Sequence, residues 1–132
     1  MNLAELGTPD FCIERNSIVK TKILSRIWFL SQKRSLRMLD VGCGNAEWLR
    51  PLLDNVTSID YFGIEPSQAL VLQAQTNLPK HAHQIHQGRG EDIKIKFTSS
   101  FDVIISRAVF EHVLKRDDFI CSVVGALRPG GT

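Results

Sequence analysis

Cysteine, charge of one sign and long apolar runs are all scarce in this sequence of 132 residues. The three cysteines, Cys12, Cys43 and Cys121, are an odd number, widely spaced and without a CxxC pair. A disulfide framework is therefore not expected, and a reducing compartment is the default. A formal net charge of +2 does not by itself indicate a nucleic-acid or membrane partner, although it does not exclude nucleic acid.

No apolar run in the sequence is long enough to cross a membrane. The longest, residues 23–30, is interrupted by Ser25 and Arg26 and is far shorter than the ~20 residues that a membrane span needs. The first residues lack the basic stretch and apolar core of a secretory signal. We therefore expect a cytoplasmic protein with no membrane partner.

What is present is the composition of one soluble globular domain, with 43% hydrophobic and 23% charged residues. Residues 1–36 are predicted to form an N-terminal helical segment, because apolar residues recur there at helical spacing. These residues are Ile18, Val19, Ile23, Ile27 and Leu30. The lysines and arginines between them favour a solvated helix face, and a basic docking surface is the alternative.

From residue 37 to residue 132 the pattern changes to short apolar strands that alternate with helical segments. Strands are expected near residues 37–41, 58–64, 82–86 and 101–106. Helices are expected near residues 46–53 and 67–76, with a last helix that begins near Asp117 and ends before Pro129. This alternation predicts an α/β fold, a parallel sheet with helices on both faces.

A glycine-rich turn joins the first of these strands to a helix. Gly42 and Gly44 allow a tight turn and a ligand lying close to the backbone, and Glu65 closes the next strand about 20 residues later. Together they indicate an adenosine-containing cofactor at the carboxyl ends of the strands. Glu47 occupies the place of the third glycine of a dinucleotide site, where its carboxylate would repel a pyrophosphate. Asp40 instead suits a cationic ligand such as S-adenosylmethionine.

Five segments of the chain stand in the order found in one enzyme family. They read LDVGCG at residues 39–44, GIEPS at 63–67, GRGEDI at 88–93, FDVIIS with VFEHV at 101–113, and LRPGG at 127–131. In this order they resemble the motifs of class I (Rossmann-like) S-adenosylmethionine-dependent methyltransferases. The resemblance implies the strand order 3-2-1-4 for the four strands and S-adenosylmethionine as the cofactor.

The resemblance also implies a set of cofactor-binding residues. These are Asp40, Gly42, Cys43, Gly44, Glu65, Pro66, Gly90, Glu91, Asp92, Ser106 and Arg107. The family often has an acid where this chain has Arg89, so recognition of the adenine is expected to pass to Asp92 and to the backbone of Gly90 and Glu91. Cys43 is interpreted as a small packing residue, because no base is spaced to activate it.

Glu111 and His112 follow the fourth strand and are the catalytic candidates. A histidine titrates near neutral pH and can act as a general base towards a hydroxyl acceptor. The alternative is that the pair only begins a helix, since acids favour first turns. No metal site is expected, because on a strand His81 and His83 share a face from which His86 points away.

In the resembled family the sheet has seven strands, and this sequence is expected to stop before the fifth can form. The edge of the fourth strand would then be uncovered, which predicts self-association or a partner chain. The leading function is transfer of a methyl group to an unidentified acceptor. A catalytically silent cofactor-binding or partner-binding module is the alternative, and Glu47 disfavours a nicotinamide-dependent oxidoreductase.

Overall fold

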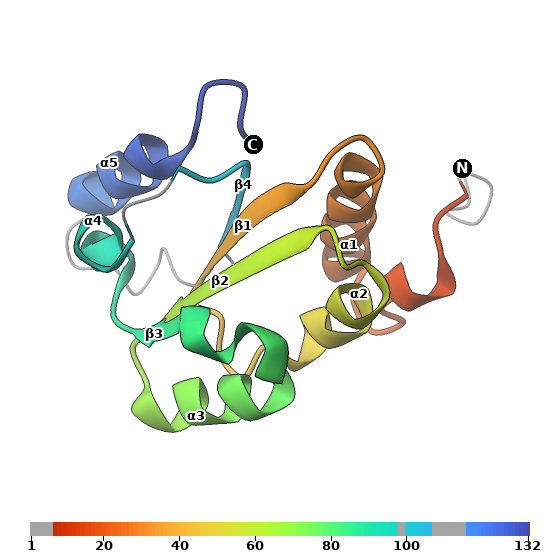
Figure 1. Cartoon of the computed structure of the whole chain (residues 1–132), viewed down its shortest axis with the longest axis horizontal. Helices are drawn as coiled ribbons and strands as arrows, with labels where there is room; N and C mark the ends of the chain where they lie inside the picture. The colour runs from red at the N-terminus through yellow and green to blue at the C-terminus, as the bar shows by residue number, and fades with distance from the viewer. Residues whose placement is uncertain (1–6, 98–99, 107–115) are drawn as a thin grey trace.

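The computed structural model describes residues 7–97, 100–106 and 116–132. Within them the sheet has four parallel strands, β1 (Leu36–Val41), β2 (Ile59–Glu65), β3 (Ile85–Gln87) and β4 (Val103–Ser106). The strands lie in the order β3-β2-β1-β4 (Figure 1), so both the expected fold class and the expected strand order are confirmed.

In the described residues, five α-helices and four short 3-10 helices precede, connect or follow these strands. The α-helices are α1 (Ile18–Ser31), α2 (Arg50–Asn55), α3 (Gln68–Asn77), α4 (Ile93–Lys96) and α5 (Arg116–Ala126). The 3-10 helices are η2 (Asp10–Cys12), η3 (Glu47–Leu49), η4 (Pro79–Gln84) and η5 (Gly90–Asp92). Serine side chains cap the N-termini of α1 and α3. Ser17 accepts a hydrogen bond from the Lys20 N–H, and Ser67 accepts one from the Leu70 N–H.

Successive side chains of each strand point to opposite faces of the sheet, so the core is divided between the two faces. Met38 of β1 packs in one cluster with residues of α1, α2 and α3, whereas Leu39 packs in a second cluster with residues of α4 and α5. Figure 1 shows α1 and α2 on one side of the sheet and α4 and α5 on the other. Helices thus cover both faces, as a parallel sheet requires.

The buried face of α1 differs from the predicted apolar stripe. Ile18 and Val19 are 73% and 55% exposed, so this part of the prediction is wrong, whereas Ile27 is buried as expected. The helix buries Thr21, Leu24, Ile27 and Ser31. Thr21 can be buried because its hydroxyl donates to backbone oxygens of the preceding turn.

The third strand is shorter and later than predicted. Residues 79–84 form the 3-10 helix η4, so His81 and His83 do not lie on a strand, and the face assigned to them from strand spacing is wrong. Pro79 starts this turn, as proline does in first helical turns. The Gln75 amide donates to the oxygens of Ala82 and Ile85, and these bonds join η4 and β3 to α3.

The outer edge of β4 is partly paired. Thr132 runs beside it: the Thr132 N–H donates to the Asp102 oxygen at 2.8 Å, and the Ile104 N–H donates to the Thr132 oxygen at 2.9 Å. These two bonds form one rung of a parallel ladder, which corrects the expectation that this edge is uncovered along its whole length. Self-association through the edge stays a prediction. Over the described residues, no helix has both the length and the apolar character needed to span a membrane.

Candidate functional site

The carboxyl ends of the central strands bring the predicted site residues together. Val41 pairs with Ile64 on one side and with Ser106 on the other, so the segments that follow β1, β2 and β4 leave the sheet at one edge. Ligands of open α/β sheets bind outside this edge. The structure therefore brings the described motif segments after β1, β2 and β4 together at this edge, and their role as a cofactor site stays a prediction.

The glycine loop turns tightly over the end of β1. Gly42 and Gly44 have φ values of 74° and 57°, in the left-handed region where glycine has no steric penalty. The N–H groups of Gly42 and Cys43 both donate to the Ile64 oxygen, at 2.8 and 3.2 Å, which ties the loop to β2. Among the described residues other than its two chain neighbours, none has an atom within 4 Å of the position that a Cβ of Gly44 would occupy, which leaves room for a ligand against the backbone.

Glu65 joins this loop to the start of α3. Its side chain is buried, and one carboxylate oxygen accepts from the Gly44 N–H at 3.2 Å while the other accepts from the Ser67 N–H at 2.6 Å. An ionised carboxylate has about four acceptor positions, so two remain for hydroxyl donors. Glu65 is thus oriented beside the loop and still able to bind a ribose.

Asp40 lies beneath the same loop and is 4% exposed. Burial raises the pKa of its carboxyl to about 7. The Tyr61 hydroxyl, which donates to Asp40 Oδ2 at 2.8 Å, acts in the opposite direction, and the charge of Glu65 raises the pKa further. The carboxylate of Asp40 is therefore a buried charge that a nearby cation would stabilise.

Cys43 is buried between these acids. Burial, followed by the charges of Asp40 and Glu65, raises the pKa of its thiol to about 12. A thiol with such a pKa carries almost no thiolate at neutral pH and is a poor nucleophile. This supports the interpretation of Cys43 as a packing residue.

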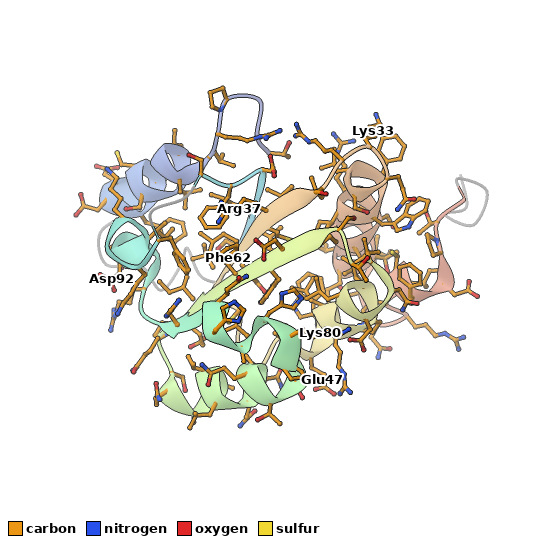
Figure 2. All side chains as sticks on the ribbon, in the orientation of Figure 1. Lys33, Arg37, Glu47, Phe62, Lys80 and Asp92 are labelled. Atoms are coloured by element: carbon orange, nitrogen blue, oxygen red, sulfur yellow. The ribbon has the colours of Figure 1, made fainter. Side chains whose placement is uncertain are left out.

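The expected adenine segment forms η5 and packs under α5. A Cβ on Gly90 would overlap the ring of Phe119, so only glycine allows the two elements to approach this closely. The Asp92 carboxylate accepts from the Arg89 N–H at 3.0 Å and so caps its own turn. Figure 2 shows Asp92 beside α4. Its role in binding adenine, with that of Glu91, stays a prediction.

The remaining expected residues are Pro66, Ser106, Arg107, Glu111 and His112. Pro66 and Ser106 are exposed where β2 and β4 end. Arg107, Glu111 and His112 lie outside the described residues. Within the described ranges, no three histidine, cysteine or acidic side chains are grouped so that they could hold a metal ion.

Sequence reasoning did not single out Tyr61, the partner of Asp40. The available signal was that the single tyrosine of the chain stands among apolar residues in the strand that follows the glycine loop. A hydroxyl in such a position needs a partner, because a buried tyrosine normally donates a hydrogen bond. The parallel register that identifies Asp40 as this partner comes only from the structure.

Known proteins resemble this chain over most of its length. It is 30% identical over 99 residues to the ubiquinone biosynthesis O-methyltransferase of Rickettsia felis, which covers 73% of this chain and 38% of that protein. It is 35% identical over 99 residues to the tRNA U34 carboxymethyltransferase of Trichlorobacter lovleyi, covering 72% of this chain and 30% of that protein. The chain thus spans less than half the length of these curated relatives.

A solved structure has the same fold. The amino pentose methyltransferase from Micromonospora echinaspora, bound to S-adenosylmethionine, superposes with a TM-score of 0.70 at 18% identity, over 99% of this chain and 54% of that one. In addition, the family described as "Methyltransferase domain" matches residues 39–132, from the strand before the glycine loop to the last residue. This match agrees with the resemblance seen in the motifs, and the chain belongs to the methyltransferase domain family.

Proposed function

We propose that the carboxyl edge of this sheet binds S-adenosylmethionine and that the protein transfers a methyl group from it to an acceptor. The observation that carries the proposal is the pair of buried carboxylates at the glycine loop, Asp40 beneath it and Glu65 beside it. The family to which the chain belongs and the cofactor in the structure of the Micromonospora relative support the same cofactor.

The residues of the site fit this cofactor better than a dinucleotide. Glu65 has free acceptor positions for the ribose hydroxyls, and the space above Gly44 admits a ligand against the loop. Asp40 places negative charge beneath the loop, which attracts the ammonium and sulfonium of the methionine end and repels a pyrophosphate. Glu47, exposed in the first turn after the loop, adds to this repulsion.

When bound, S-adenosylmethionine supplies a methyl group on a sulfonium that is already a good leaving group. The work left to the protein is to hold the acceptor in line with that methyl and to remove a proton from it. We assign the second task to Glu111 and His112, because both follow β4 in sequence and the end of β4 lies beside Val41 at the site edge.

Calorimetric titration of the chain tests the cofactor. We expect micromolar binding of S-adenosylmethionine and no binding of NAD. The Glu65→Gln variant, which keeps an acceptor but loses the charge, should bind at least about tenfold more weakly, the effect of losing a charged hydrogen bond. Glu47→Gln is the matched control, and its affinity should stay within about twofold because Glu47 is exposed. Binding of NAD with equal or greater affinity would contradict the proposal.

The assignment of His112 has a separate test. In the His112→Ala variant we expect turnover to fall by about 10²–10⁴-fold, the usual contribution of a general base, with the affinity for S-adenosylmethionine unchanged. Turnover is measured with the acceptor once it is identified. Undiminished turnover in this variant would remove His112 from the mechanism while leaving the cofactor site intact.

A further inference from the structure

Tyr61 and Asp40 lie on neighbouring strands and on the same face of the sheet. In the parallel register Met38 pairs with Tyr61 and Asp40 pairs with Gly63. The tyrosine therefore lies two residues nearer the amino ends of the strands than the position opposite Asp40. The Tyr61 side chain is fully buried, and its hydroxyl reaches along the face to within 2.8 Å of Asp40 Oδ2. The hydroxyl therefore occupies the space beside the carboxylate.

Gly63 leaves the room that this contact needs. A Cβ at Gly63 would lie 3.1 Å from Cys43 Sγ and 3.3 Å from the Tyr61 hydroxyl oxygen. Such distances are shorter than ordinary van der Waals contacts, so a side chain there would push against both groups. The Tyr61 hydroxyl, which donates to Asp40, also interacts with the Cys43 thiol of the glycine loop.

Building on the proposed function, we propose that Tyr61 is a positioning residue for the cofactor. Its hydroxyl favours the ionised form of the Asp40 carboxyl beneath the glycine loop, where the negative charge attracts the cationic methionine end. Asp40 is too deeply buried to be a surface contact, and it acts through its field, which is weakly screened in the interior.

The charges around Asp40 explain why the hydroxyl matters. From β2, Tyr61 donates a hydrogen bond and Glu65 contributes a second negative charge; from the loop, the Cys43 thiol faces the same space. Burial and the charge of Glu65 raise the pKa of Asp40, whereas the hydrogen bond from the Tyr61 hydroxyl lowers it. Burial and the charge of Asp40 raise the pKa of Tyr61 well above its ordinary value. The hydroxyl therefore stays protonated and can donate its hydrogen bond to Asp40.

The test compares the unaltered chain with the Tyr61→Phe variant in two measurements. The first is the titration of the Asp40 carboxyl carbon by NMR without any cofactor. Loss of the hydroxyl should raise its midpoint by about one pH unit, which is the size of one hydrogen bond to a charged group. Ser25→Ala, which deletes a hydroxyl that donates to the Thr21 oxygen within α1, is the control and should leave the midpoint unchanged.

The second measurement is the dissociation constant for S-adenosylmethionine between pH 6 and pH 9. If only the ionised form of Asp40 attracts the ligand, Tyr61→Phe should bind about tenfold more weakly at pH 6 and less than about twofold more weakly at pH 9. Titration of the ligand's own amino group is common to both proteins and cancels in this ratio. A purely structural role would give the same ratio at every pH.

An unchanged Asp40 midpoint, or a ratio that does not vary with pH, overturns the inference. If Tyr61→Phe does not fold, the ring Cζ of Tyr61 in the unaltered chain decides, since its resonance must follow the midpoint of Asp40 if the two groups are coupled. The NMR titrations of Asp40 and Tyr61 need no ligand. A chain that fails to bind S-adenosylmethionine while Tyr61 and Asp40 titrate together therefore refutes the proposed function and not the coupling.

Discussion

Two buried aspartates, one near the carboxyl ends of the strands and one near their amino ends, have opposite surroundings. Asp40, at the carboxyl edge, and Asp102, just before β4 at the amino edge, are each 4% exposed. Asp102 accepts from the Arg37 N–H at 2.8 Å and forms ion pairs with Arg128 and, at 4.0 Å, with Arg34. The groups that act on Asp40 are a tyrosine hydroxyl and a second carboxylate.

The contrast separates a charge that holds the fold from a charge kept for a ligand. Removing a carboxylate from water costs free energy unless a cation and hydrogen bonds compensate it. At the amino edge the protein supplies that compensation from the turn after α1, from β1 and from the turn after α5. Figure 2 shows Arg37 beside Phe62, and its guanidinium lies 5.0 Å from that ring's centre. At the carboxyl edge the compensation is left to a cationic ligand.

Asp102→Ala tests the structural half of the comparison and should have the largest effect. The substitution leaves arginine charges at the amino edge without their partner and removes the acceptor for the Arg37 N–H. We expect the free energy of unfolding to fall by up to about 3 kcal/mol, the upper range for a hydrogen bond to a charged group, because the two arginines are partly exposed and water can hydrate them once Asp102 is gone. Urea denaturation measures it. A loss below about 1 kcal/mol would contradict the structural role.

Asp40→Asn tests the other half and should change stability in the opposite direction. The pKa of Asp40 is raised to about 7 from its ordinary value of 3.8, so the folded state holds this proton more tightly than the unfolded state. The contribution of Asp40 to stability is then fully present below about pH 4 and is lost as the pH rises through about 7. The asparagine removes this loss.

We therefore expect Asp40→Asn without ligand to be more stable than the unaltered chain by about 2 kcal/mol at pH 8. The difference should shrink towards pH 5, where Asp40 is protonated in the folded state. The same variant should bind S-adenosylmethionine more weakly. Urea denaturation at the two pH values measures the first effect and calorimetry the second. Equal stabilities at pH 8 would mean that Asp40 is compensated as fully as Asp102.

Asp54→Asn is the reference for an exposed acid outside both aspartate environments. It should change the free energy of unfolding least of the three variants. Asp54 forms an exposed pair with Arg50 within α2 at 3.7 Å. Exposed pairs of this kind contribute roughly 0.3–0.5 kcal/mol. Denaturation at low and high salt should show a change within that range and smaller at high salt. A larger change would show that charge alone, without burial, accounts for the effect at Asp102.

Sequence patterns predicted those parts of the molecule that depend on local chemistry. The glycine loop, the Ser67 cap and the acid that ends β2 each follow from residue types at short spacing, and the structure has all three. Only the start of the α1 face was predicted wrongly, because Ile18 and Val19 are apolar and yet exposed, while a threonine satisfied by backbone oxygens is buried. Hydropathy alone cannot register that hydrogen bond.

The two aspartate environments depend on contacts between distant residues. The Arg37 N–H and Asp102 are 65 positions apart in sequence, and Tyr61 and Asp40 are 21 apart. Nothing in the residue types distinguishes the compensated acid from the uncompensated one, because both follow or precede apolar strand residues. Only the register of the strands and the path of the turn after α5 decide which acid meets an arginine.

The strand order β3-β2-β1-β4 has a consequence for the way this chain acquires its structure during synthesis. β1 pairs with β2, which follows it closely, but its other side must wait for β4, as in the pair Met38 with Val103. Contacts over long sequence separation form slowly, and the N-terminal part of a chain leaves the ribosome first. The nascent chain can thus assemble the glycine loop with Glu65 before Asp102 emerges from the ribosome, which places the ligand-directed acid in the early unit and the structural acid in the late one.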